Sequence, residues 1–458
     1  MRRLLQLASL LLLMLFPTLL LAQLETNVWA FGENALVDFN SGTAVSIGGS
    51  AIDQNEGCAS IADRRTGALL FYTDGVTVWD RAHQPMPNGT GLNGDESSTQ
   101  AAIIIPAPLN NFRYYVFTSD AGEYAGPNIG IHYSVVDMAT NGGMGSVITK
   151  NVFLLRPAAE KLTAARHCNG RDYWVIAHRW ESNQFYAWLV SPNGVSLPVV
   201  SAVGAVHRDL TAVSAGANTL GYMKTSPNGK KIAVALAESG IIELFDFDNL
   251  TGAISNPIRL TGIRNAYGLT FSHDNTKLYS VSSNYDPLLP PSDTLIQFDV
   301  TSGVATIIQN SRVNLYINND RHFGALQMAS DGKIYVGHAF FPMLGIIQSP
   351  NTAGLGCNYI NNGLSLEHHP AATAFRTIST DSSTPPPLPT PSPANAPKQS
   401  WDQKTPQSAL GLALISGMRV PGLSPSGNGR SAGQRRNRPT SSIQKASATT
   451  PPGITKFG

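Results

Sequence analysis

The chain has 458 residues, including 42 Gly and 30 Pro. Such a composition, with few long helical periodicities, is typical of a turn-rich all-β protein and speaks against a largely helical one. The formal net charge of +2 is unevenly distributed, because residues 376–458 hold ten basic and two acidic residues and residues 1–375 hold 22 basic and 28 acidic ones.

The first 22 residues are predicted to be a secretory signal peptide. Arg2 and Arg3 precede an apolar stretch at residues 4–21 that ends at Ala22, as in Sec export signals. A membrane anchor is the alternative, because this stretch approaches the length that spans a bilayer. Pro17 interrupts it and no basic stop-transfer flank follows. We therefore expect a secreted or outer-surface protein with no transmembrane anchor after cleavage.

Short strands and hairpins follow the signal. Three short strands are predicted at residues 27–31, 35–39 and 44–47. Six β-hairpins come next, at residues 58–72, 102–117, 162–176, 223–236, 269–281 and 326–336. The last three are the clearest, and Asn-Gly and Asp-Gly favour type I′ turns between their strands.

Each hairpin begins a larger repeat. The turns, at Gly67, Asn111, Gly170, Gly229, Asn275 and Gly332, lie 44 to 59 residues apart. A third strand follows each hairpin, at residues 76–80, 131–137, 185–190, 242–248, 295–300 and 344–348, and a poorly marked fourth strand comes after it. This period predicts a β-propeller of four-stranded blades over residues 26–375. We expect seven blades, or six if the opening strands only complete the last blade.

Residues 376–458 are predicted to form a disordered Pro/Ser/Arg-rich tail, because residues 384–397 are dominated by Pro and little apolar surface follows. Four arginines, at positions 430, 435, 436 and 438, could touch an acidic polymer, but no aromatic residues interleave for base stacking. We expect a solvated tail and no nucleic-acid partner.

Several runs of the propeller region are similar to one known family. They are residues 69–80 (LLFYTDGVTVWD), 98–104 (STQAAII), 133–138 (YSVVDM), 172–176 (DYWVI), 243–248 (ELFDFD) and 357–359 (CNY). The match covers about residues 26–368 and resembles the N-terminal WD40/YVTN-like propeller of large secreted Bacteroidetes proteins. In that family PKD modules and often a type IX sorting domain follow. The resemblance implies an extracellular location and an adhesive, scaffolding or glycan-related role.

The sequence departs from this family after Leu366. A Gly-Leu-Pro strand and a PKD module with a Gly-Asp-Gly turn are both missing from the remaining residues. The change to Pro/Arg-rich sequence suggests a frameshifted or truncated gene, and whether the tail is native stays open.

Two hypotheses of function follow. The first is a non-enzymatic propeller, expected to be a monomer, that binds an extracellular protein or a polysaccharide. Loops carry the recognition residues of propellers, and the candidate aromatic residues are Tyr124, Trp180, Tyr285 and Phe341. The alternative is a lactonase-like or glycan-cleaving enzyme, with candidate groups that could meet at one channel mouth: Arg166, His167, His178, Glu181 and His207.

No cofactor or metal is expected. Cys58, Cys168 and Cys357 form no C-x-x-C pair, and their disulfide state stays open, although buried apolar positions are favoured. The run from Asp246 to Asn249 resembles part of a calcium loop but lacks its Gly and distal Glu. An Asx turn at a strand end is the favoured interpretation.

Overall fold

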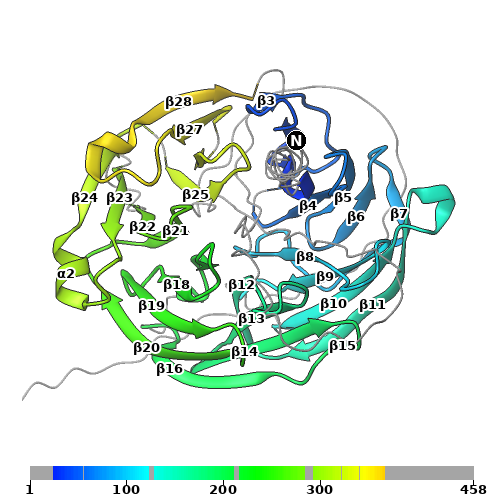
Figure 1. The fold of residues 1–458 in the computed structure, drawn as a ribbon, viewed down its shortest axis with the longest axis horizontal. Coiled ribbons are helices and arrows are strands. Elements are labelled where there is room, and N and C mark those ends of the chain that lie inside the picture. Colours follow the sequence, from blue (N-terminus) through cyan, green and yellow to red (C-terminus); the bar gives the residue numbers. More distant parts are fainter. Residues whose placement is uncertain are drawn as a thin grey trace, which may run out of the picture. The chain divides into compact units, whose positions relative to one another are not determined.

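A computed structural model describes residues 24–366 except residues 55, 123–127, 211–215, 284–291, 321 and 340. These residues belong to one compact unit of the chain, residues 1–419. They form seven antiparallel sheets arranged in a ring, each built from strands that are consecutive in the sequence (Figure 1). The predicted signal peptide and tail lie outside the described residues.

The strands have the following bounds. The first sheet holds β1 (Val28–Phe31), β2 (Ala35–Asp38) and β3 (Val45–Ser46), and the second holds β4 (Ala59–Ala62), β5 (Leu69–Thr73), β6 (Thr77–Asp80) and β7 (Pro85–Thr90). The third holds β8 (Ala102–Pro106), β9 (Arg113–Ser119), β10 (Ile131–Asp137) and β11 (Ser146–Leu155), and the fourth holds β12 (Ala158–Arg166), β13 (Tyr173–Arg179), β14 (Ser182–Ser191), β15 (Gly194–Val195) and β16 (Val199–His207). The fifth holds β17 (Met223–Thr225), β18 (Lys231–Leu236), β19 (Ile241–Asp248) and β20 (Ala253–Leu260).

The sixth sheet holds β21 (Ala266–Phe271), β22 (Lys277–Ser282), β23 (Asp293–Asp299) and β24 (Val313–Asn318), and the seventh holds β25 (Phe323–Met328), β26 (Ile334–His338), β27 (Met343–Ile347) and β28 (Tyr359–Ser365). The described helices are short: η1 (Leu24–Thr26), η2 (Asn141–Gly143), α2 (Ala305–Asn310) and η3 (Gly354–Cys357). Within the described ranges no helix is long and apolar enough to cross a membrane.

The prediction of a seven-bladed propeller is confirmed. All six predicted hairpins form the first two strands of a sheet, and the three opening strands form a sheet of their own instead of completing the last one. Five sheets have four strands, the first has three, and the fourth has five because β14 pairs with both β15 and β16. Side chains on both faces of the inner strands are buried, as in β12, where all nine residues are buried.

The tight turns of the clear hairpins differ from the predicted type I′. Among the described residues of these turns only Gly229, Asn275 and Gly332 have positive φ, at 64°, 66° and 79°. A type I′ turn needs two consecutive residues with positive φ. Gly332 donates its N–H to Ala329 O at 3.0 Å, and Ala329 N–H closes the hairpin on Lys333 O at 2.9 Å. Three-residue loops of this kind place one left-handed residue at the last position.

We expect Gly332→Val to destabilise the propeller by about 1–3 kcal/mol, because a β-branched residue is strained at a φ of 79°. No neighbouring atom lies within 4 Å of an added Cβ, so the strain comes from the backbone alone. Lys333→Ala, next to it, should change stability by no more than about 0.5 kcal/mol. Thermal melts of the two variants check this, and equal melting temperatures would contradict the turn geometry.

The first sheet lacks a counterpart of the innermost strand of the other sheets. Asn34, in the β1–β2 turn, donates to Ile52 O in the loop before β4, whereas Asn40, after β2, donates to Gly67 O in the β4–β5 turn. Strand β1 therefore runs antiparallel to β4, the first strand of the next sheet. The second strand of a sheet has this direction relative to the first strand of the sheet that follows, so β1 corresponds to a second strand. Its edge is capped by side chains: Ser60 Oγ donates to Val28 O at 2.8 Å, and Cys58 Sγ donates to Ala30 O.

Aromatic packing joins the first and last sheets. The Trp29 ring lies 5.6 Å from the Tyr335 ring, and the Phe39 ring lies 5.4 Å from it, both edge to face. Such pairs add stability beyond the area that they bury. The ring thus closes by packing among the described residues, and not by pairing of strands from the two ends of the chain.

None of the three cysteines forms a disulfide within the described residues. Cys58 and Cys357 are buried, as predicted for small apolar residues, and burial raises the pKa of the Cys357 thiol. Cys168 is exposed in the β12–β13 turn, so the prediction of burial is wrong for this residue.

Candidate functional site

Two of the four candidate aromatic residues are placed by the structure, and both lie at the same end of the propeller. Trp180 lies in the loop between β13 and β14, and Phe341 lies in the loop between β26 and β27. Loops between second and third strands all fall at one end of a ring of such sheets. Both side chains are partly buried. Tyr124 and Tyr285 lie outside the described residues.

Trp180 and Phe341 sit on ordered turns. Trp180 N–H donates to Pro157 O at 3.2 Å, which ties its loop to the start of β12. The Phe341 ring centroid lies 6.5 Å from that of His338. Both rings are partly buried and partly exposed, and the Trp180 backbone is tied to β12, which suits stacking on a ligand.

The five polar candidates do not meet at one channel mouth. His178, Glu181 and His207 lie at the same end of the fourth sheet, where Glu181 N–H donates to His207 O at 2.8 Å. Arg166 and His167 lie at the other end, beside the β12–β13 turn. His167 Nε2 is 3.2 Å from Leu250 O of the next blade. The expectation of a convergent set is therefore wrong: the two strands of one hairpin carry these residues to opposite ends of the sheet.

His178 and His207 form a stacked, buried pair. Their ring centroids are 3.4 Å apart with the planes tilted by 14°, and both side chains are fully buried. The ring nitrogens make no well-formed hydrogen bond among the described residues, although the Arg179 backbone near His178 slightly opposes the fall in its pKa. Burial and the nearby Lys161 lower the pKa of His178 to about 3, and burial also lowers that of His207. Neutral imidazoles in this setting pack like aromatic rings.

A buried polar network that the sequence analysis missed joins the inner strands. The Glu160 carboxylate accepts four hydrogen bonds, from Thr99 N–H and Oγ1, both at 2.8 Å, from Gly122 N–H at 2.7 Å and from Thr219 Oγ1 at 3.0 Å. The Lys161 ammonium donates to three consecutive backbone carbonyls, those of Thr219, Leu220 and Gly221, at 2.7–3.1 Å. Burial lowers the pKa of Lys161 to about 7, and the adjacent Glu160 opposes this shift.

Gln100 extends this network across three blades. Its Oε1 accepts N–H donors from Leu162 and Met223, and its Nε2 donates to Met223 O at 3.1 Å. Tyr222 Oη, close by, donates to Thr99 O at 2.9 Å. Glu160, Lys161 and Gln100 therefore hold the third, fourth and fifth sheets together. The signal in the sequence was the charged pair inside the apolar run of residues 158–166.

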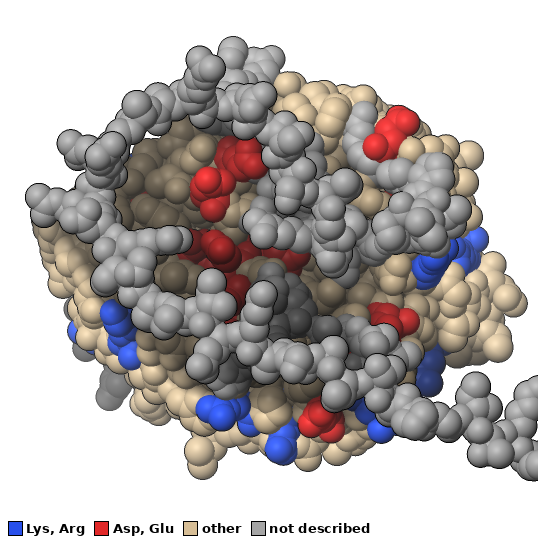
Figure 2. All heavy atoms as spheres, turned by 180° about the vertical axis from the view of Figure 1, so that it is seen from behind, with Lys and Arg blue, Asp and Glu red and all other residues tan. Residues whose placement is uncertain are grey.

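One face of the propeller is hollowed at its centre, and Asp and Glu side chains gather in the hollow (Figure 2). Lys and Arg side chains lie mainly toward the outer edge of this view. Carboxylates also lie close together elsewhere: Asp95, on a loop, and Glu160, on β12, add to the effect of burial in raising the pKa of Asp120. Negative potential focused in a concavity attracts cationic groups.

The calcium-like run is an Asx turn. Asp248 Oδ1 accepts the Leu250 N–H at 3.0 Å, and Asp248 Oδ2 accepts the Thr251 hydroxyl at 2.7 Å. Asp246 pairs with Lys231. In the part of the chain that the structure describes, no group of three or more His, Cys, Asp or Glu side chains could hold a metal ion.

No model of a protein family matches the sequence, and no curated protein matches it. Several solved structures are similar to it. Hsv2 from Kluyveromyces lactis has 11% identity, covering 70% of this chain and 90% of Hsv2, with a TM-score of 0.42. A functionally unknown protein from Desulfotomaculum acetoxidans has 11% identity over 74% and 94% of the chains, with a TM-score of 0.40. Hydrazine synthase from Kuenenia stuttgartiensis has 12% identity over 72% and 78%, with a TM-score of 0.38. None of these likenesses carries an argument about function.

Proposed function

We propose that this chain is a secreted or cell-surface propeller that binds an extracellular protein or a glycan without chemical turnover. The observation that carries the proposal is the position of Trp180 and Phe341 on loops at one end of a rigid ring. A ring braced internally by Glu160 and Lys161 fixes the strands on either side of the Trp180 loop, and such preorganisation favours binding. The resemblance to secreted Bacteroidetes propellers supports the extracellular location.

The polar residues favour binding over catalysis as well. His178 and His207 are fully buried and stacked on each other. Glu160 and Lys161 already hold several structural partners each. A general acid or base must reach the proton that it transfers, and these four groups face the protein interior.

An array of proteins and polysaccharides tests the proposal. We expect a ligand whose affinity falls about fivefold or more in Trp180→Ala or Phe341→Ala, because a lost aromatic contact costs on the order of 1 kcal/mol. The matched control is Phe112→Ala, which removes an exposed ring from the β8–β9 turn at the other end of the propeller.

The same preparation is assayed for hydrolysis of lactones and glycans. We expect no turnover by the parent chain and unchanged binding in a His167→Ala/Glu181→Gln double variant. Turnover that disappears in this double variant, while binding persists, would establish the enzyme and refute the proposal.

A further inference from the structure

A pocket of about 230 Å³ lies between the fifth and sixth sheets. Its floor is apolar and consists of Leu244, Phe245, Ile258, Phe271, Val300 and Ile308. Its rim is polar and consists of Asn228, Lys230, Lys231, Asn256, Asn275 and Thr301. The rim comes from turns between first and second strands, from the segment after β23, and from the strand residues Lys231 of β18 and Asn256 of β20. The pocket therefore lies toward the end of the propeller opposite to Trp180 and Phe341.

Lysines are the charged residues in the lining of the pocket. Two lysines and no Asp or Glu line it. Lys231 is paired with Asp246 behind the rim. Lys230 is exposed and makes no ion pair within the described ranges. A ligand that brings a carboxylate to Lys230 would form a charge-assisted hydrogen bond there.

One side of the rim is fixed by Asp246. Its Oδ1 accepts from Lys231 Nζ and its Oδ2 accepts from Asn256 Nδ2 at 2.8 Å. Asn256 has a φ of 54°, at an irregularity in the pairing of β19 and β20. This backbone conformation and the bond to Asp246 set the direction of the Asn256 amide. Asn256 is one of the rim residues.

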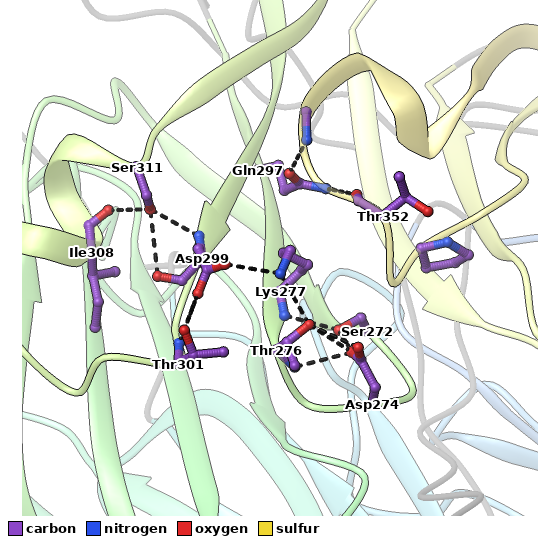
Figure 3. A network of polar contacts seen from close by, with 12 residues as sticks. Ser272, Asp274, Thr276, Lys277, Gln297, Asp299, Thr301, Ile308, Ser311 and Thr352 are labelled. Atoms are coloured by element: carbon purple, nitrogen blue, oxygen red, sulfur yellow. Dashed lines mark hydrogen bonds and ion pairs between the residues drawn. The ribbon is translucent and has the colours of Figure 1, made fainter.

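The opposite side of the rim is fixed by Asp299 (Figure 3). Asp299 accepts from Lys277 Nζ at 2.9 Å and from both the N–H and the hydroxyl of Thr301, and Ser311 Oγ accepts the Asp299 N–H at 2.8 Å. Burial raises the pKa of Asp299, but the bonds from Thr301 and Lys277 outweigh it and bring the pKa to about 2. The charged carboxylate thus holds Thr301 in place, and the bond from Asp299 N–H to Ser311 Oγ fixes the end of α2.

We propose that this pocket binds one hexuronic acid unit of an acidic glycan. The volume is below that of sites for drug-sized ligands and suits a single ring. Three amide side chains and one hydroxyl at the rim match the hydroxyl groups of a sugar, the apolar floor matches its C–H face, and Lys230 matches its carboxylate. This site is separate from the loop face of the proposed function.

Galacturonate and glucuronate are the probes, titrated into the full chain by ligand-observed NMR at low salt, with galactose and glucose as neutral counterparts. We expect the uronates to bind at least tenfold more tightly than the neutral sugars, because a hydrogen bond between the carboxylate and the Lys230 ammonium is stronger than one between neutral groups. Lys230→Ala should weaken uronate binding about tenfold.

Asn256→Gly removes the amide without straining the positive φ, and we expect it to weaken uronate binding about fivefold. Lys333→Ala, in the equivalent turn of the last blade, is the matched control and should leave binding unchanged. Trp180→Ala should also leave uronate binding unchanged, and this result would distinguish the pocket from the binding site proposed at the loops. Melting temperatures show that each variant is folded.

Three outcomes would overturn the inference: no uronate binding by the folded parent chain at tens of millimolar, equal binding in the Lys230 and Asn256 variants, or tighter binding of benzoate than of either uronate. The last result would assign the pocket to aromatic carboxylates instead.

Discussion

Replacing Glu160 by Ala is expected to destabilise the propeller by about 3–5 kcal/mol, the cost of breaking a buried charged network by removing one partner. Four donors from Thr99, Gly122 and Thr219 lose their acceptor. The buried ammonium of Lys161 also loses the neighbouring carboxylate. Urea unfolding of the parent and the variant measures the change in free energy.

Glu181→Ala is the matched control, since Glu181 is an exposed carboxylate on the same blade. Its effect should stay within about 0.5 kcal/mol. Glu160→Gln keeps one acceptor oxygen, so its loss of unfolding free energy should lie between those of Glu160→Ala and Glu181→Ala. If Glu160→Ala cost no more than Glu181→Ala, the brace between the three blades would have no role in stability.

Acidification from pH 6.5 to pH 5 is expected to lower the stability of the fold through His178 and His207. In the folded chain the pKa of His178 is about 3 and that of His207 is also well lowered. The unfolded chain binds protons at these groups below about pH 6.5 and the folded chain does not. The free energy of unfolding therefore falls by up to about 1.4 kcal/mol per pH unit for each histidine.

Glu25 opposes this loss. Burial raises the pKa of Glu25 to about 7 in the folded chain. As the pH falls, the Glu25 carboxylate is therefore protonated in the folded chain before it is protonated in the unfolded chain. The free energy of unfolding gains from this as the pH falls from about 7 to about 4.5, the pKa of Glu25 in the unfolded chain. Burial also lowers the pKa of His132, which adds to the loss, so the net slope should be smaller than that of the three histidines together. Urea unfolding at pH 5.0, 5.5, 6.5 and 7.5 measures it.

In His178→Leu the loss on acidification should become smaller by about 1.4 kcal/mol per pH unit, whereas His273→Gln, at an exposed turn position, should keep the slope of the parent. A parent slope that survives in His178→Leu would mean that the stacked pair takes up protons in the folded state.

The hairpins and the blade number could be predicted because their signals are local. Alternation of apolar residues fixes strand faces, and Gly229, Asn275 and Gly332 mark turns that join strands only a few residues apart. The turn type could not be predicted, since a single left-handed residue satisfies the same Asn-Gly and Asp-Gly pairs. Fourth strands were poorly marked because they are half exposed and interrupted, as by Pro85 and Pro87 in β7.

The candidate sites depend on contacts between distant segments, so the sequence predicted them less well. Arg166 on β12 and His178 on β13 are close in sequence, yet antiparallel pairing places them at opposite ends of this hairpin. Lys230 and Thr301 come together at one pocket across seventy residues. Neither apolar periodicity nor a sequence motif indicates which distant residues lie close together in space, because this depends on how neighbouring sheets pack.

The contiguity of every sheet in the sequence has a consequence for folding order. Each described blade closes its own hydrogen bonds from neighbouring strands, and none waits for a strand from the far end of the chain. Contacts of short sequence separation form fastest, so blades can assemble one after another as the chain leaves the ribosome. The contact of Trp29 and Phe39 with Tyr335 then forms last. When these aromatic residues are replaced by smaller ones, we expect an intermediate to accumulate in which all blades are folded but the first and last sheets are not yet packed together.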